Sequence, residues 1–224
     1  MKSDPEFSVV AIDGPAASGK STVARNLARR LSFSYVNSGA LYRAVAWLVC
    51  QRAIPLNNPA AIYSQIRGSL FELRLDNKEL RIRIDGMDPA LHLRDEEVNR
   101  AVSPVSAIPQ VREFLVAHLR EFIDLDNLVM EGRDIGSIVF PDTPYKFYID
   151  ASLEVRAHRR AAQGQSDDLF YRDRVDSSRR TSPLIIAEDA HVIDSSSRTI
   201  DGVVGEIVER LKMQRLQAAL NLYS

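Results

Sequence analysis

The stretch AIDGPAASGKSTVARNLARRL, from Ala11 to Leu31, decides what kind of fold to expect. It contains the pattern G-x-x-x-x-G-K-[ST], with Gly14 and Gly19 as its glycines and Lys20 and Ser21 at its end. Glycines let a loop adopt backbone angles that other residues avoid, so its N–H groups can converge on an anion. The lysine adds a point charge for the outer phosphates of a nucleotide, and the serine hydroxyl can bind magnesium. The residues expected to hold the phosphates are Gly14, Pro15, Ala16, Ala17, Ser18, Gly19, Lys20, Ser21 and Thr22.

The sequence on both sides of this loop has the pattern that the motif requires. FSVVAI, residues 7–12, is a short run rich in β-branched residues, which is typical of a buried strand. After the loop, Val23, Leu27 and Leu31 recur at helical spacing. A phosphate-binding loop between a strand and a helix is therefore predicted. The alternative, a glycine-rich turn with a chance Lys-Ser pair, leaves the flanking pattern unexplained.

The composition of the whole chain narrows the class of protein further. Its 224 residues are 45% hydrophobic, which suits one globular domain over residues 1–224. The net charge of −1 does not favour nucleic acid or an anionic membrane as a partner. The chain has one cysteine, Cys50, its histidines lack the spacing of a zinc site, and no apolar run is long enough to span a membrane. We therefore expect a cytoplasmic protein.

Strand-like and helix-like segments alternate along the chain. This alternation predicts an α/β fold with a parallel sheet flanked by helices. Ligands of such sheets bind at the carboxyl ends of the strands, where the glycine loop follows the first strand-like run. The expected strands are residues 7–12, 127–131, 145–150 and 191–194, and the expected helices are 21–31, 40–51, 111–123, 153–162 and 200–217.

One segment departs from this alternation. FELRLDNKELRIRID, residues 71–85, alternates apolar and polar side chains on both sides of Asp76-Asn77-Lys78. That pattern predicts a small antiparallel hairpin with one covered face. We interpret it as an insertion on the parallel core, spanning about residues 62–99.

Arginines and acidic residues are both dense between residues 153 and 180. A solvated surface of exposed ion pairs is the ordinary explanation for such a run. A nucleic-acid patch is disfavoured, because acids are interleaved with the arginines and no aromatic platform accompanies them. Downstream of a phosphate-binding loop, we favour a third interpretation, in which arginines neutralise phosphate oxygens during phosphoryl transfer.

These motifs, taken together and in order, resemble the bacterial cytidylate kinase family. The resemblance covers nearly the whole chain, and its most specific motif is EGRDIGSIVFPD, residues 131–142. The other matching pieces are IDGPAASGKST (12–22), NSGALYR (37–43), SPVSAIPQVR (103–112), FYIDASLEVRAHRR (147–160), RDRVDSSR (172–179) with SPL (182–184), and VIDSSS (192–197).

The resemblance implies transfer of a phosphoryl group from ATP to CMP or dCMP, with Mg2+, by a monomer. It implies a P-loop kinase core with a monophosphate-binding insertion at residues 62–99 and a lid at residues 157–172. Catalytic roles fall to Lys20, Arg133, Arg172 and Arg179, and Ser21 would bind the metal. Ser38, Tyr42, Arg43 and Arg133 would hold the CMP phosphate; Ser103, Arg112 and Asp134 would read cytosine; Arg172, Asp176 and Arg179 would meet the ribose or the transferring phosphates; and Arg156 and Arg160 would bind ATP.

The chemistry of these residues agrees with the implied reaction. The second pKa of a monophosphate is about 6, so its attacking oxygen is already anionic at neutral pH. The reaction therefore needs no general base. A carboxylate such as Asp134 can accept from the N4 amino group of cytosine, whereas uracil presents an acceptor at that position.

Two features depart from the family's pattern. Asn37 stands where the family usually has Asp, and the stretch between Arg160 and Arg172 is shorter than the usual lid.

Structural roles compete with some of these assignments. Asp134 could cap the turn after its strand, and Ser38 could cap its helix. Arg43 and Asp176 could form surface ion pairs. Other functions also stay open at this point: a UMP, AMP or shikimate kinase, a nucleotide-dependent switch protein, or an RNA-binding protein that uses the arginines.

Overall fold

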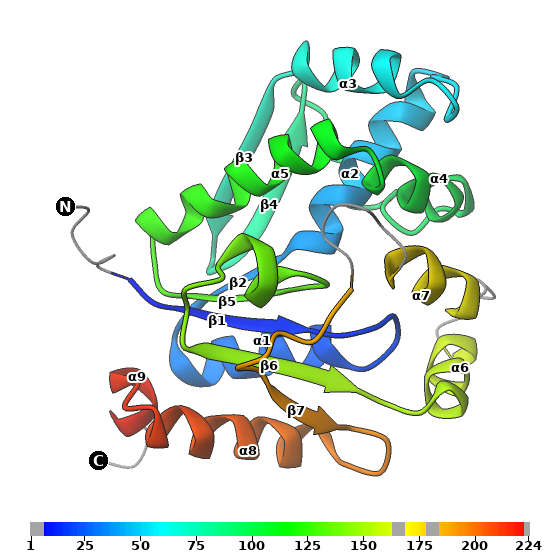
Figure 1. Ribbon diagram of the computed structural model, residues 1–224. Coiled ribbons are helices and arrows are strands. Elements are labelled where there is room, and N and C mark those ends of the chain that lie inside the picture. The colour runs from blue at the N-terminus through cyan, green and yellow to red at the C-terminus, as the bar shows by residue number, and fades with distance from the viewer. Residues whose placement is uncertain (1–6, 163–168, 178–183, 222–224) are drawn as a thin grey trace. The chain divides into compact units, whose positions relative to one another are not determined.

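β1 (Val9–Asp13) is an inner strand of the sheet, and the glycine loop begins directly after it (Figure 1). The computed structural model describes residues 7–162, 169–177 and 184–221. The chain divides into two units, the first made of residues 1–36 and 121–224 and the second of residues 37–120.

The sheet of the first unit has the strand order β2-β5-β1-β6-β7. β1 pairs in parallel with β5 and β6, and β6 pairs in parallel with β7. Every residue of β1 and β5 is buried, as expected for central strands of a covered parallel sheet. This arrangement confirms the predicted α/β class. The strands other than β1 are β2 (Ser34–Asn37), β5 (Leu128–Gly132), β6 (Tyr145–Asp150) and β7 (His191–Asp194).

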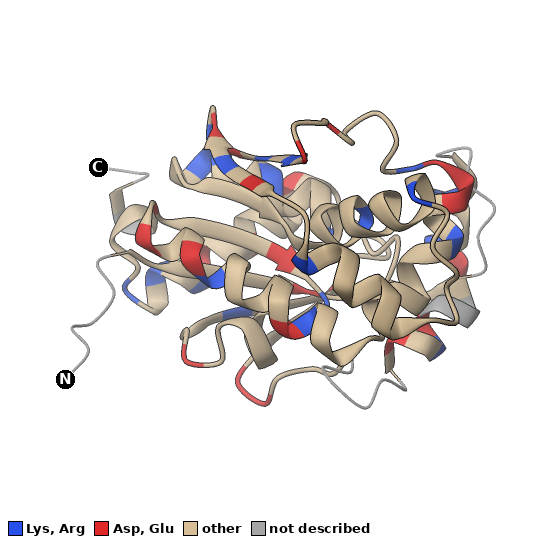
Figure 2. Cartoon of the chain, turned by 90° about the horizontal axis from the view of Figure 1, so that it is seen from above, with Lys and Arg blue, Asp and Glu red and all other residues tan. Residues whose placement is uncertain are grey.

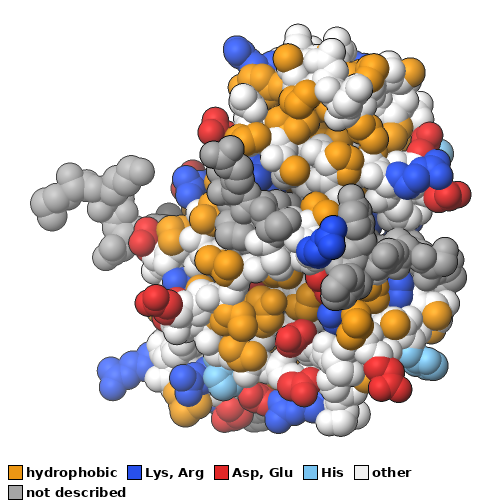
Figure 3. All heavy atoms as spheres, turned by 45° about the vertical axis from the view of Figure 1, so that its right-hand side comes forward, with side chains coloured by type: hydrophobic (Ala, Val, Ile, Leu, Met, Phe, Trp, Pro, Cys, Tyr) orange, Lys and Arg blue, Asp and Glu red, His pale blue; other side chains and the backbone are white. Residues whose placement is uncertain are grey.

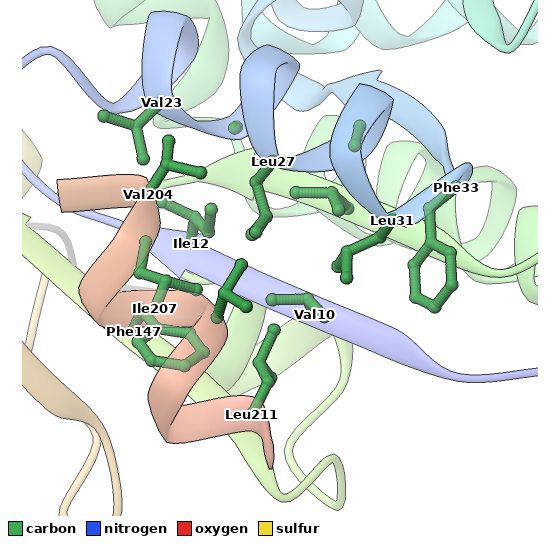
Figure 4. Close-up of a cluster of buried hydrophobic side chains, with 14 of the residues drawn as sticks. Val10, Ile12, Val23, Leu27, Leu31, Phe33, Phe147, Val204, Ile207 and Leu211 are labelled. Atoms are coloured by element: carbon green, nitrogen blue, oxygen red, sulfur yellow. The ribbon is translucent and has the colours of Figure 1, made fainter. Parts of the chain in front are cut away.

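Two helices of this unit, α1 (Lys20–Leu31) and α8 (Ile200–Met213), pack over β1 (Figure 4). The spacing of apolar residues on α1 directs one face of the helix to the strand. The labelled core side chains are Val10, Ile12, Val23, Leu27, Leu31, Phe33, Phe147, Val204, Ile207 and Leu211. The remaining helices of the unit are the 3-10 turn η1 (Phe122–Asp124), the π-helical turn η2 (Ile135–Val139), α6 (Leu153–Ala162), α7 (Leu169–Ser177) and α9 (Gln217–Leu220).

The second unit contains the predicted hairpin. Strands β3 (Phe71–Asp76) and β4 (Glu79–Ile84) pair antiparallel, with Phe71 opposite Ile84. The two residues that connect them, Asn77 and Lys78, both have positive φ, 49° and 63°, as a two-residue hairpin turn requires. The helices of this unit are α2 (Ser38–Gln51), α3 (Pro59–Arg67), α4 (Glu96–Ser106) and α5 (Pro109–Glu121).

Several predicted element boundaries were wrong. The helix predicted over residues 200–217 ends at Met213, because Arg215 takes a left-handed φ of 60° and the chain restarts as the short α9. The helix predicted over residues 111–123 is α5, which starts two residues earlier and gives way to η1. The helix predicted over residues 40–51 begins at Ser38. The sequence patterns also missed β2, α3, α4 and α7.

No helix among the described residues is long and apolar enough to cross a membrane. Lys, Arg, Asp and Glu are interspersed along the elements (Figure 2). On the face drawn in Figure 3, the described basic side chains likewise alternate with acidic ones. That distribution does not favour the RNA-binding alternative, which calls for a basic stripe or patch.

Candidate active site

The glycine loop between β1 and α1 has the geometry of a phosphate cradle. Gly14 has φ 151° and Gly19 has φ 90°, both outside the range that side chains favour. A Cβ on Gly14 would lie 2.1 Å from the carbonyl oxygen of Ile149, so the loop needs glycine there. Gly19 is the N-cap of α1 and offers no side chain to cap the helix. The loop therefore presents the amino end of a helix, which favours an anion.

Lys20 is the first residue of α1, directly after this loop, and is buried, with 5% of its surface exposed. Its Nζ donates to the carbonyl oxygen of Pro15 at 2.8 Å. Ser18 is fully buried, and its Oγ has no hydrogen-bond partner among the described residues. Ser21 and Thr22 are exposed in the first turn of α1. The Ser21 hydroxyl is thus accessible, and a hydroxyl oxygen is a suitable ligand for a hard cation such as Mg2+.

Arg156 of α6 connects the loop to α7. It is buried, and its Nε donates to Ala151 O at 3.1 Å. Its Nη1 donates to Ala16 O at 3.2 Å and also forms an ion pair with Asp173 of α7. Asp173 in turn accepts from the backbone N–H of Ala16 at 3.5 Å. The structure thus brings this predicted ATP-binding arginine to the glycine loop.

A second arginine of α6, Arg159, holds the loop from another side. Its guanidinium donates to Ser18 O at 3.1 Å and to Ser195 O at 2.7 Å. The Ser195 hydroxyl donates to the same Ser18 carbonyl at 2.8 Å. The sequence analysis gave neither residue a site role of its own: Arg159 was included only in the arginine-dense stretch, one helical turn after Arg156, and Ser195 only in the quoted VIDSSS motif. The helical spacing of Arg159 from Arg156 and the motif that contains Ser195 were the signals that could have identified these two residues.

Arg133, directly after β5, contacts Asp176 of α7. Its Nε donates to Asp176 Oδ2 at 2.9 Å, and the two side chains are 20% and 6% exposed. Burial opposes the charge of Arg133, but the hydrogen bond to Asp176 and the negative charges of Asp176, Glu131 and Asp173 together outweigh burial, and the pKa of the guanidinium is raised. The guanidinium is therefore held in its charged form, and Asp176, with its side chain 6% exposed, is not a solvated surface residue.

Asp134 is buried at the N-cap of η2, with 3% of its surface exposed. Its side chain makes no capping hydrogen bond, which contradicts the alternative that Asp134 merely caps the turn after its strand. The backbone N–H groups of Ile135 and Gly136 instead donate to the carboxylate of Asp13, each at 2.8 Å. Burial is the main reason that the pKa of Asp13 is raised to about 7, and the two backbone hydrogen bonds oppose that shift.

Five other predicted site residues belong to the second unit. Arg112 is buried, its guanidinium carbon lies 5.1 Å from the ring centre of Tyr42, and its Nη1 donates to Ser106 O at 3.2 Å. Arg43 donates to Leu93 O at 2.8 Å and to Asn99 Oδ1 at 2.7 Å. Ser38 and Ser103 are buried.

The cap of α2 corrects one expectation about Ser38. The N-cap is Asn37, whose Oδ1 accepts from Ala40 N at 2.9 Å, and Ser38 is the first residue of the helix. The alternative role of Ser38 as N-cap is therefore wrong. Asn37 also has a structural task at the position where the family usually has Asp.

Part of the predicted site lies outside the described residues. Arg179 is one such residue, and so are positions 163–168 of the predicted lid. Arg172 belongs to α7 by its backbone, but its side chain is not described. Arg160 lies on α6 and is half-buried.

A strand, a glycine loop and a helix that close around a buried lysine, with arginines from α6 beside the loop, define a P-loop protein of the phosphate-transferring class. The cytidylate kinase family model matches residues 10–213. The chain belongs to the cytidylate kinase family.

Individual relatives agree with this assignment. The cytidylate kinase of Caldanaerobacter subterraneus subsp. tengcongensis is 40% identical over 214 residues, covering 91% of this chain and 94% of that protein. That of Rhodococcus jostii is 41% identical over 212 residues, covering 89% and 93%. That of Thermotoga neapolitana is 39% identical over 220 residues, covering 93% and 98%. The family resemblance predicted from the sequence motifs is confirmed.

Proposed function

We propose that this chain transfers the terminal phosphoryl group of ATP to CMP and dCMP, which gives CDP or dCDP and ADP. The observation that carries the proposal is the phosphate cradle at Gly14–Lys20, folded between β1 and α1 in a chain whose family match spans residues 10–213. No observation favours a UMP, AMP or shikimate kinase, or a switch protein.

The reaction is a direct in-line displacement. An oxygen of the CMP phosphate forms a bond to the γ-phosphorus of ATP, while the bond from that phosphorus to the β,γ-bridging oxygen breaks and ADP leaves. The attacking oxygen is already anionic at neutral pH, so no side chain has to remove a proton. The chain's task is to position two anions and to neutralise their charge.

Charge neutralisation is assigned to the loop and to arginines. The backbone N–H groups of the loop from Gly14 to Thr22, except at Pro15, which has none, and the ammonium of Lys20 would hold the β- and γ-phosphates. Arg156 and Arg160 of α6 would join them, and the contact of Arg156 with Ala16 supports that role. Arg133, Arg172 and Arg179 would act on the transferring group.

Recognition of CMP is assigned to the remaining predicted residues. Arg43, Arg133, Ser38 and Tyr42 would hold its phosphate, and Asp176 with Arg172 would meet the ribose. Asp134, Ser103 and Arg112 would read cytosine. Burial supports the last group, since all three side chains are below 8% exposed and buried polar groups discriminate strongly between partners.

Mg2+ is assigned to Ser21 together with the nucleotide. Among the described residues, no group of three or more His, Cys, Asp or Glu could hold a metal by itself. Mg2+ is commonly held by one or two side chains plus phosphate oxygens, and the exposed Ser21 hydroxyl fits that donor set. The ion would neutralise phosphate charge.

Other expectations stay predictions. They are the cytoplasmic location, the monomeric state, a single domain over residues 1–224, the insertion at residues 62–99 and the lid at residues 157–172.

The proposal is tested by an ADP-release assay with ATP, Mg2+ and a panel of acceptors: CMP, dCMP, UMP, AMP, GMP and shikimate. We expect the highest kcat/KM with CMP and dCMP, with CDP or dCDP as the second product. ADP release without an acceptor would indicate the switch class. Preference for UMP, AMP or shikimate would overturn the assigned substrate.

A further inference from the structure

The last residue of β1, Asp13, has a buried carboxylate whose contacts the proposed reaction does not explain. It directly precedes Gly14, and 6% of its surface is exposed. Its Oδ1 accepts from Ile135 N and its Oδ2 from Gly136 N, both at 2.8 Å. Both oxygens are thus directed at the backbone of one segment, more than a hundred residues further along the chain.

That segment is the start of η2, the turn that follows Asp134. The first N–H groups of a helical turn have no partner within the turn, and a side chain at the N-cap usually accepts from them. Here the N-cap residue is Asp134, and its side chain makes no such hydrogen bond. Asp13 does so from the neighbouring strand. Asp134 thus occupies the N-cap position of η2, while the carboxylate of Asp13 accepts the hydrogen bonds from its first N–H groups.

The fit between Asp13 and this segment is tight. A Cβ on Gly136 would lie 3.4 Å from Asp13 Oδ2 and 3.1 Å from Cγ of Lys146. The backbone at Gly136 is thus packed closely between the aspartate and the lysine. The backbone oxygen of Asp134 is fixed as well, because Ile138 N and Val139 N donate to it at 2.9 and 3.1 Å. The position of Asp134 thus depends on a segment that Asp13 holds.

We propose that Asp13 is a positioning residue for base selection: it fixes the backbone of Ile135 and Gly136 and thereby orients Asp134. The inference rests on the proposed function, which assigns Asp134 to cytosine. Asp13 itself does not contact the base. Its effect on CMP must therefore pass through Asp134, and this dependence separates positioning from general support of the fold.

The test is a double-mutant cycle on the ratio of kcat/KM for CMP to kcat/KM for UMP. Asp13→Asn keeps the shape of the side chain, but its amide can accept from only one of the two N–H groups. We expect it to lower the ratio by about three- to tenfold in the unaltered protein. In an Asp134→Asn background the same substitution should leave the ratio unchanged.

Asp150 provides a matched control. It is also the last residue of a parallel strand, β6, but its carboxylate accepts only from the adjacent Ala151 N, at 2.8 Å, among the described contacts. Asp150→Asn should leave the CMP-to-UMP ratio as it is. If it lowers the ratio as much as Asp13→Asn does, the effect is a general consequence of altering this edge of the sheet, and the inference is wrong.

The outcomes distinguish this inference from the function on which it rests. If Asp134→Asn changes the ratio while Asp13→Asn lowers CMP and UMP efficiency equally, the positioning role alone is overturned. If Asp134→Asn leaves the ratio unchanged, the assignment of Asp134 is itself overturned. Should Asp13→Asn fail to fold, Gly136→Ala decides, because its methyl group would lie 3.1 Å from Cγ of Lys146 and 3.4 Å from Asp13 Oδ2, and so crowds the contact between Asp13 and the segment while Asp13 is retained. An unchanged ratio in Gly136→Ala would overturn the inference.

Discussion

Arg133 donates through Nε to Oδ2 of Asp176 at 2.9 Å, which joins the end of β5 to α7 across 43 positions of the sequence. The pair is largely shielded from water, so removing one charge leaves the other without its compensation. We expect Asp176→Asn to lower the free energy of unfolding by about 1–3 kcal/mol. Urea denaturation measures this change.

An exposed pair provides the control for that measurement. Arg100 and Glu96 lie one helical turn apart on α4, with side chains 69% and 84% exposed. Glu96→Gln should change the free energy of unfolding by less than about 0.5 kcal/mol. Equal losses in Asp176→Asn and Glu96→Gln would show that the Arg133–Asp176 pair is no more than a surface contact.

Lys20 can be compared with a second buried lysine. Lys20 donates to Pro15 O at 2.8 Å, and Lys146 donates to Pro141 O at 2.6 Å, in each case five residues earlier in the chain. Methionine keeps most of the volume of either side chain. We expect Lys20→Met to lower kcat at least about a hundredfold, because its charge is needed most in the transition state.

Lys146→Met should instead destabilise the protein, since it breaks an ion pair with Asp189, and leave kcat far less affected. Steady-state kinetics and thermal unfolding of both variants separate the two roles. Near-normal turnover of Lys20→Met would remove the glycine loop from the proposed reaction.

Asn37 can be replaced by the aspartate that the family usually has at this position without removing the N-cap of α2. An aspartate keeps the Oδ1 that accepts from Ala40 N, so Asn37→Asp should fold as well as the natural chain. The added carboxylate should alter the Mg2+ concentration needed for half-maximal turnover. A superimposable magnesium titration would mean that the departure from the family has no effect in this chain.

The pKa of Asp13 makes a prediction about pH. Burial is the main cause that raises the pKa of the folded carboxyl from 3.8 to about 7, and Asp134 raises it further while Lys20 lowers it. Between these two pH values the folded state binds a proton that the unfolded chain has lost. The contribution of Asp13 to stability is therefore fully present below about pH 4 and is lost as the pH rises towards 7.

Urea unfolding of the natural chain and of Asp13→Asn at pH 5, 6, 7 and 8 measures this effect. The difference between the two free energies of unfolding should change between pH 5 and 7, by at most about 1.4 kcal/mol for each pH unit, and then level off. A difference that is independent of pH would show that Asp13 keeps an ordinary pKa in the folded protein.

The sequence was sufficient for the elements with a strong local pattern. The glycine loop and α1 follow from the spacing of glycines and leucines, and the hairpin follows from strict alternation around Asn77-Lys78. β2 was missed because SYVN is a run of four residues that begins with serine. α4 was missed because Pro104 stands inside it, and a proline beyond the first turn removes a backbone hydrogen bond and argues against a helix.

The site was predicted only where a residue type implies a ligand. Lys20, Arg156 and Asp134 were chosen for their own chemistry or through the family motifs. Asp13, Arg159 and Ser195 act on other parts of the chain, through contacts that span from 36 to 177 positions. Such contacts depend on the tertiary fold, and no local spacing encodes the capping of η2 by a residue of β1.

The measurement that tests the account most directly is the choice of base by Asp134. Its carboxylate is proposed to accept from the N4 amino group of cytosine, and asparagine keeps the shape while adding a donor that can face O4 of uracil. We predict that Asp134→Asn lowers kcat/KM with CMP and narrows the gap between CMP and UMP by about one to two powers of ten. If the CMP-to-UMP ratio is the same in both proteins, Asp134 does not read the base and the proposed recognition of cytosine is wrong.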